Sequence, residues 1–330
     1  MIRIALDAMG GDNAPGVPVD GAVLAQRELS DQCEILLVGR QGEVEAALSR
    51  HSSVPTGISV VDAPEVVAMG DKPLFSVRRK PNSSIAVGLK LHKEGQVDAF
   101  LSAGNTGAVM ATSVLTLGLH PGVGRPAIAS PLPTDIDPII VIDSGANVDC
   151  SSRELEGFAR LGTVYARDIL GYKMPRVGLL NIGGEAEKGS AAAKEAYALL
   201  MGSTEFEFVG NIEGRDVLHD KCDVVVCDGF VGNVVLKLME SAADFFITVL
   251  RRELDKETMD SGGMTRAIAT LDWATYGGAP LLGVRGISII CHGSSSPLAI
   301  KNAIKVAVQS VVKGLNDHIE ATFSQTRTEA

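Results

Sequence analysis

One pattern recurs along this chain of 330 residues and constrains its fold more than any other feature. A short aliphatic run ends at a polar cluster containing Gly or Asp, and a segment with helical periodicity usually follows. Runs that are apolar on both faces are typical of strands buried in a parallel sheet. Strands that alternate with helices predict a layered α/β fold. The nine runs are 2–6, 34–38, 58–61, 99–102, 139–142, 177–180, 206–209, 224–227 and 287–291.

Many of the 36 glycines lie in the clusters that follow these runs. A single cluster of this kind is most simply a tight turn between a strand and a helix. Several clusters, however, also carry Asn, Asp, Thr, Ser or His. In open parallel sheets, ligands bind beyond the carboxyl ends of the strands. We therefore predict that the clusters form a shared binding site at one edge of the sheet.

Composition narrows the class of protein. The 30 basic and 40 acidic residues give a net charge of −10, which disfavours nucleic-acid binding. Five scattered cysteines without a C-x-x-C pair favour a reduced, cytoplasmic protein, and Cys291 is expected in the core. The sequence shows no signal peptide, and no apolar run approaches the ~18 residues of a membrane span.

Neither a linker nor an internal repeat divides the chain, so we predict one domain over residues 1–330. If it has two lobes, they would be joined by an irregular crossing at 121–138. Residues 233–256 predict a long amphipathic helix, and a second helical stretch to about 275 completes a helical hairpin (233–275). Its apolar stripe is compatible with intrachain packing or with a subunit interface. Membrane contact is less favoured; it would involve Met264, Ile268, Leu271 and Trp273.

Several familiar site motifs are absent from the sequence. It contains no P-loop, no G-x-S-x-G, no H-E-x-x-H and no EF-hand loop. The dinucleotide-binding fingerprint has only an incomplete match, at 122–127. The six histidines are dispersed. We therefore expect neither a metal nor a cofactor.

The remaining clusters are suited to anions, because helix N-termini offer free N–H groups and partial positive charge. Candidate phosphate cradles are Gly104–Gly107, Gly229–Asn233 and Gly293–Ser296, the last with His292 alongside.

Three charged features have both a structural and a functional interpretation. Lys188 could bind an anion or could be a solvated lysine near Glu185 and Glu187. Asp228 fits either a helix cap or a catalytic or orienting group. The basic cluster 78–80 is either solvated or a dock for an acidic protein.

These clusters together resemble the bacterial phosphate acyltransferase family. The matching stretches run in order over nearly the whole chain. They are Asp7–Asp12, Arg78–Ser84, Ser102–Ala108, Asp143–Asn147, Gly178–Gly183 with Glu185, Lys188 and Gly189, Gly210–Asp216, Asp228–Asn233, Tyr276–Ala279 and His292–Ser295.

The resemblance implies a three-layer α/β/α fold with a mostly parallel sheet, similar to phosphotransacetylases and isocitrate-dehydrogenase-like enzymes, and a homodimer. The implied reaction transfers a fatty acyl group from acyl carrier protein (ACP) to inorganic phosphate. The resemblance also implies a cytoplasmic protein, loosely associated with the membrane, that supplies acyl phosphate to a membrane-bound glycerol-phosphate acyltransferase for phospholipid synthesis.

This reaction suits the residues, because phosphate is itself the nucleophile and no serine elbow or metal is needed. Lys188 would neutralise phosphate or oxyanion charge, Asp228 would orient Lys188 or His292, and His292 would protonate the departing thiolate. The expected phosphate-binding residues are Asn105, Thr106, Asn233 and Ser294. Asn147 is expected to bind substrate, and the expected ACP dock is Arg78, Arg79 and Lys80. Three rival functions stay open: an acyl-CoA-dependent phosphotransacylase, a decarboxylating dehydrogenase and a non-catalytic scaffold.

Overall fold

The computed structural model describes residues 1–134, 136–271 and 275–325, without the side chains of 74–76 and 325. The chain divides into two compact units. The first unit comprises Met1–Ile128, Asp168–Gly171 and Gly277–Ala330, and the second comprises Ala129–Arg167 and Tyr172–Tyr276. The boundary near residue 128 falls within the segment 121–138.

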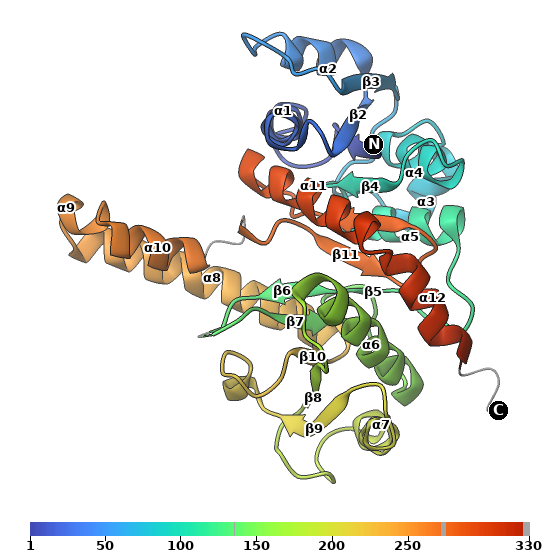
Figure 1. Cartoon of the computed structure of the whole chain (residues 1–330), viewed down its shortest axis with the longest axis vertical. Coiled ribbons are helices and arrows are strands. Elements are labelled where there is room, and N and C mark those ends of the chain that lie inside the picture. Colours follow the sequence, from blue (N-terminus) through green and yellow to red (C-terminus); the bar gives the residue numbers. More distant parts are fainter. Residues whose placement is uncertain (135, 272–274, 326–330) are drawn as a thin grey trace. The chain divides into compact units, whose positions relative to one another are not determined.

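The first unit is built on a seven-stranded sheet of order β3-β2-β1-β4-β12-β11-β5 (Figure 1). The five strands from β3 to β12 are parallel, and β11 and β5 are antiparallel to their neighbours. The strands are β1 (Ile2–Asp7), β2 (Cys33–Gly39), β3 (Ile58–Asp62), β4 (Ala99–Ser102), β5 (Ala127–Ile128), β11 (Ala279–Leu282) and β12 (Ile287–Ile290).

In the first unit, α1 packs on α11, and both α4 and α3 pack on α5. The chain runs outward from β1 through β2 to β3 and then returns to the other side of β1 as β4. Because such crossovers are right-handed, this reversal places α1 and α4 on opposite faces of the sheet. The helices are α1 (Gly16–Leu29), α2 (Gln41–Leu48), α3 (Pro73–Arg79), α4 (Ser84–Lys93), α5 (Thr106–Leu117), α11 (Pro297–Val312) and α12 (Leu315–Gln325).

The second unit has a five-stranded sheet of order β6-β7-β10-β8-β9 (Figure 1). Only β6 is antiparallel to its neighbour. The strands are β6 (Ser130–Leu132), β7 (Ile139–Ile142), β8 (Arg176–Leu180), β9 (Glu207–Ile212) and β10 (Val224–Val226). The helical elements are α6 (Ser152–Tyr165), η1 (Ala166–Leu170), α7 (Ala191–Met201), η2 (Gly214–Asp216), α8 (Gly229–Glu253), α9 (Lys256–Met259) and α10 (Gly262–Leu271).

The predicted α/β class and the predominance of parallel pairing are confirmed, with the strands distributed over two sheets. All nine expected strands are present. Three more were missed: β11, and both β5 and β6, which lie inside the segment expected to be irregular. They are only two to four residues long, and their antiparallel partners define them. One boundary was also wrong, because β9 continues through Gly210 and Asn211 to Ile212.

The predicted hairpin is present as α8, α9 and α10, although α8 begins at Gly229, four residues before the expected start. Trp273, the aromatic residue of the suggested membrane contact, lies outside the described residues. One face of α8 packs on the five-stranded sheet, with Leu236 in its core cluster. Another carries exposed apolar side chains: Phe230, Val234, Leu238, Phe245 and Phe246. Within the described parts, no helix is both long and apolar enough to cross a membrane.

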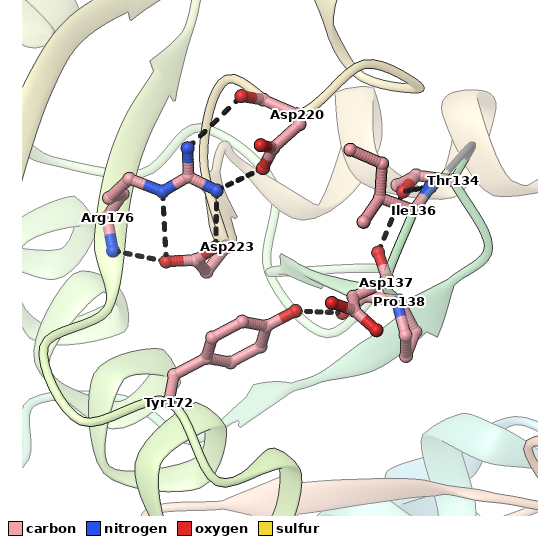
Figure 2. A network of polar contacts seen from close by, with 8 residues as sticks. All are labelled: Thr134, Ile136, Asp137, Pro138, Tyr172, Arg176, Asp220 and Asp223. Carbon is pink, nitrogen blue, oxygen red and sulfur yellow. Dashed lines mark hydrogen bonds and ion pairs between the residues drawn. The ribbon is translucent and has the colours of Figure 1, made fainter.

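An ion-pair network fixes the amino ends of the strands in the second unit (Figure 2). Asp223 accepts hydrogen bonds from Arg176 at the backbone N–H (2.7 Å), Nε (3.3 Å) and Nη2 (2.8 Å). Arg176 also pairs with Asp220, and the Tyr172 hydroxyl donates to the Pro138 carbonyl at 3.2 Å. Asp223 and then Asp220 raise the pKa of Arg176, so this network stays charged. It lies at the strand ends opposite to the glycine clusters.

Candidate functional site

A buried carboxylate lies at the carboxyl end of β1, where the strand order of the first sheet reverses. Asp7 is 1% exposed. Its Oδ2 accepts a hydrogen bond from Ser102 Oγ at 2.6 Å, and its Oδ1 accepts one from the Met9 N–H at 3.0 Å. Burial raises the pKa of Asp7, and its hydrogen bonds oppose that rise. Parallel strands on either side of a reversal leave a crevice beyond their carboxyl ends, so Asp7 marks the place where this fold class binds ligands.

The turns after β1, β4 and β12 contact one another at this edge. A Cβ on Gly10 would lie 2.6 Å from the Gly104 nitrogen and 2.7 Å from Asp7 Oδ2, so only glycine permits this approach. The Asp12 N–H donates to the Gly293 carbonyl at 2.8 Å. The turns enclose a narrow hollow that is lined by Gly10, Gly11, Ala103 and Gly293, among others. Three glycine clusters from distant parts of the sequence thus lie side by side.

In the turn before α5, the groups that can bind an anion are mainly backbone N–H groups. Asn105 caps the helix, since its Oδ1 accepts from the Ala108 N–H at 2.9 Å, and its Nδ2 donates to the Met69 and Asp71 carbonyls at 2.8 and 3.2 Å. The Asn105 side chain is therefore committed to local structure. Within the described chain, the N–H groups of Thr106 and Gly107 have no hydrogen-bond partner. Thr106 is exposed, so its hydroxyl and these two N–H groups can bind an oxyanion.

His292 and Ser294 form a closed turn after β12. The Nδ1 of His292 accepts from the Ser294 N–H at 3.2 Å and lies 2.7 Å from the Ser294 Oγ. A neutral His292 therefore carries its proton on Nε2. Ser296 caps α11 and Pro297 occupies its first position, as is favoured at helix starts. Cys291 is buried, as expected, and burial raises its pKa to about 12, which excludes a ready thiolate nucleophile.

The basic cluster at the end of α3 does not present three equivalent charges. Arg78 and Arg79 are exposed. Lys80 Nζ instead donates to the Val66 carbonyl at 2.7 Å and pairs with Asp71 Oδ2 at 2.6 Å. This pairing lowers the pKa of Asp71. Lys80 thus holds the segment 66–71, and the exposed side chains of the cluster are those of the two arginines.

The second unit has its own buried carboxylate, Asp143, directly after β7. It accepts hydrogen bonds from the Ala146 N–H at 3.1 Å and from the Asn147 N–H and Nδ2 at 2.6 and 2.9 Å. The Asn147 carbonyl accepts from the Gly229 N–H at 2.6 Å. Asn147, expected to bind substrate, therefore joins Asp143 to the start of α8.

Asp228 is the N-cap of α8, accepting from the Val231 N–H at 3.0 Å. Its carbonyl accepts from the Gly232 N–H at 2.9 Å. The expected cradle 229–233 is the first turn of the helix rather than a loop before it, and local bonds use most of its N–H groups. Asn233 is exposed within α8 and faces Gly145, whose added Cβ would lie 3.5 Å from its Oδ1.

Lys188 lies in the turn between β8 and α7, three residues before the helix starts rather than at its start. Its N–H donates to the Glu185 carbonyl at 3.1 Å, and its carbonyl accepts from Asn181 Nδ2 at 3.1 Å. The backbone of Lys188 is thereby fixed while its side chain is exposed. No ion pair of Lys188 occurs among the described residues. Its ammonium group is available to an anion.

The candidate residues are divided between the units. The first unit holds Arg78, Arg79, Lys80, Asn105, Thr106, His292 and Ser294, and the second holds Asn147, Lys188, Asp228 and Asn233. Sequence reasoning missed Asp7, Ser102 and Asp143. Asp7 and Asp143 each follow an apolar run directly, and a carboxylate in that position was the signal that could have identified them. The described residues contain no cluster of His, Cys, Asp and Glu that could hold a metal ion.

Known proteins with similar sequences and structures agree with this architecture. The chain is 48% identical to a phosphate acyltransferase of Desulforamulus reducens, over 99% of both chains, and 45% identical to one of Nostoc punctiforme, over 98% and 96%. Its fold is similar to that of EutD phosphotransacetylase from Staphylococcus aureus (TM-score 0.62, 14% identity, 94% of both chains covered). It is also similar to a branched-chain phosphotransacylase from Enterococcus faecalis (TM-score 0.60, 14% identity, 94% of this chain and 99% of that chain covered). A family profile described as "Fatty acid synthesis protein" matches residues 2–318, and the chain belongs to this family.

Proposed function

We propose that this protein transfers a fatty acyl group from acyl-ACP to inorganic phosphate, forming acyl phosphate for phospholipid synthesis and free ACP. The full-length identity of 45–48% to phosphate acyltransferases carries this proposal. The site geometry supports it, because the N–H groups of Thr106 and Gly107, which have no partner in the described parts of the chain, suit a small oxyanion.

In the proposed reaction, a phosphate oxygen attacks the carbonyl carbon of the thioester. The tetrahedral oxyanion then collapses, the C–S bond breaks, and the ACP thiolate takes up a proton. Holding phosphate beside the thioester would contribute on the order of 7–11 kcal/mol, and one donor to the oxyanion about 3–4 kcal/mol.

The proposed roles follow from the side chains that local structure leaves available. The N–H groups of Thr106 and Gly107 and the Thr106 hydroxyl bind phosphate, and Lys188 neutralises phosphate or oxyanion charge. His292 protonates the leaving thiolate from Nε2. Further residues support the binding of these substrates: Asn105, Asn147, Asn233 and Ser294. Asp228 acts as an orienting carboxylate.

The partners are proposed from the exposed surfaces. ACP is strongly acidic, so Arg78 and Arg79 suit its docking, with Lys80 supporting their segment. A second copy of the chain would cover the exposed apolar stripe of α8, which would make the protein a homodimer. We place the protein in the cytoplasm, loosely associated with the membrane, where a glycerol-phosphate acyltransferase would consume the acyl phosphate.

The direct test incubates the purified protein with long-chain acyl-ACP and orthophosphate and traps acyl phosphate with hydroxylamine. We expect hydroxamate that depends on both substrates, with no added metal or nicotinamide. A parallel reaction with acyl-CoA tests the donor, because a faster rate with acyl-CoA would refute the ACP assignment. Binding of acyl-ACP without hydroxamate would show a scaffold instead.

A further inference from the structure

Asp7 and Ser102 come from the two strands, β1 and β4, between which the order of the first sheet reverses. They are 95 residues apart in sequence, yet both are buried and in direct contact. Neither is exposed enough to bind phosphate directly. Any role that they have in phosphate binding must therefore be indirect, through the candidate phosphate turn that they contact.

The hydrogen bonds at Ser102 form a chain that leads to Asp7 when the carboxyl group is ionised. The Gly104 N–H donates to Ser102 Oγ at 3.0 Å, and Ser102 Oγ donates its single proton to Asp7 Oδ2 at 2.6 Å. The N–H of Met9 donates to the other carboxylate oxygen. Only donors thus face Asp7 in these contacts, and an ionised carboxylate is the side chain that accepts from all of them.

This chain of bonds determines which backbone groups of the turn remain available. The Gly104 N–H points inward to Ser102, and the Asn105 side chain holds the Met69 and Asp71 carbonyls on the other side of the turn. The turn is therefore fixed from both sides. The N–H groups of Thr106 and Gly107, which are without partners in the described structure, follow directly from it.

We propose that Asp7 and Ser102 are positioning residues for phosphate, which hold the 104–107 turn with its free N–H groups directed at the ligand. The proposal rests on the proposed function of that turn. Preorganised donors bind an oxyanion without a reorganisation cost, so loosening the turn would weaken phosphate binding before it affected the acyl donor.

The test compares Ser102→Ala with Ser288→Ala. Ser288 is a matched control, since it is also buried in the same sheet and its hydroxyl lies 3.1 Å from that of Ser113. Each variant removes one buried hydroxyl: Ser288→Ala loses the contact with Ser113, whereas Ser102→Ala loses the bonds to Asp7 and to the Gly104 N–H and thereby the support of the turn. For each protein we would measure KM for phosphate, KM for acyl-ACP, the phosphate Kd by calorimetry, and Tm.

We expect Ser102→Ala to raise the phosphate Kd and KM about tenfold, the effect of one hydrogen bond, and to change the acyl-ACP KM less than about twofold. Ser288→Ala should lower Tm, because it also removes a buried hydrogen bond, and should leave phosphate binding unchanged. Ser102→Thr, which keeps the hydroxyl, should restore phosphate binding, and Asp7→Asn should weaken it. Equal phosphate constants for the two alanine variants would overturn the proposal.

The two readouts separate this inference from the proposed function. If the wild type produces acyl phosphate and Ser102→Ala leaves its phosphate KM unchanged, the positioning role is wrong and the function stands. If the wild type binds phosphate in a Ser102-dependent way but forms no acyl phosphate, the function is wrong and the positioning role stands. A wild type that neither binds nor uses phosphate refutes both.

Discussion

Replacing Arg176 with Met should weaken the second unit by an amount that the ion-pair network predicts. Asp223 has a side chain only 5% exposed, and it accepts two side-chain hydrogen bonds from the Arg176 guanidinium. Arg176→Met removes both and leaves the carboxylate with the Arg176 backbone N–H bond. Breaking a buried ion pair typically costs 3–5 kcal/mol. Because Arg176 is 30% exposed and water can reach the site, we expect the lower end, about 3 kcal/mol.

The suitable assay is native-state hydrogen exchange, because it reports on the affected strands and does not assume that both units unfold together. Val224 of β10 pairs with Val177 of β8 beside the network. A loss of about 3 kcal/mol should lower the protection of their amides about a hundredfold, since 1.4 kcal/mol corresponds to a factor of ten.

Asp220→Asn is the matched control, because Asp220 pairs with the same Arg176 but is 51% exposed. An exposed ion pair contributes about 0–1 kcal/mol, so protection should fall less than about fivefold. In the Arg176→Met background, Asp223→Asn should restore part of the protection by removing the uncompensated charge. If Arg176→Met lowered protection no more than Asp220→Asn does, the argument from burial would be refuted.

Four further predictions concern the site and its surfaces. Burial raises the pKa of Asp7 above 3.8, so its stabilising effect is full below that value and is lost as pH rises through the raised pKa; thermal melts should show wild type losing stability relative to Asp7→Asn as pH rises above about 4, and a constant difference would contradict this. Lys188→Ala should lower turnover at least about a hundredfold in the hydroxylamine assay with Tm unchanged, because its side chain is exposed; near-normal turnover would remove it from the mechanism. Reversing the charges of Arg78 and Arg79 to Glu should raise KM for acyl-ACP, more at low salt, while the phosphate KM stays constant; a salt-independent effect would count against docking there. Phe245→Asp on the exposed stripe of α8 should convert a dimer to monomers in sedimentation velocity, and an unchanged dimer would locate the interface elsewhere.

Strands could be predicted from sequence where burial alone defines them. The runs that became β1, β4, β7 and β10 are apolar on both faces, because helices or neighbouring chain cover both sides of a parallel strand. The strands β5, β6 and β11 are too short for a periodic signal and arise from pairing with distant partners. The division of the strands into two sheets likewise depends on which strands pair with each other. That pairing joins residues far apart in sequence, so the local sequence pattern does not reveal it.

The candidate site shows the same limit at the level of single side chains. Sequence placed Asn105, Asn147 and Asp228 among the functional residues because Asn and Asp at strand ends suit ligands. In the structure, each caps a helix or holds a neighbouring turn. Ser102 did not stand out, although it links the turn before α5 to Asp7.

The order of residues along the chain determined where apolar runs stop and glycine turns begin, and hence that polar groups gather at strand ends. Tertiary structure alone decided which of those groups remain available, because hydrogen-bonding capacity is finite and the neighbours that use it come from remote segments. The pairing of β1 with β4 brings Ser102 to Asp7, and this contact turns the Gly104 N–H inward. Among the residues that the structure describes, nothing pairs with the N–H groups of Thr106 and Gly107, which leaves them to a ligand.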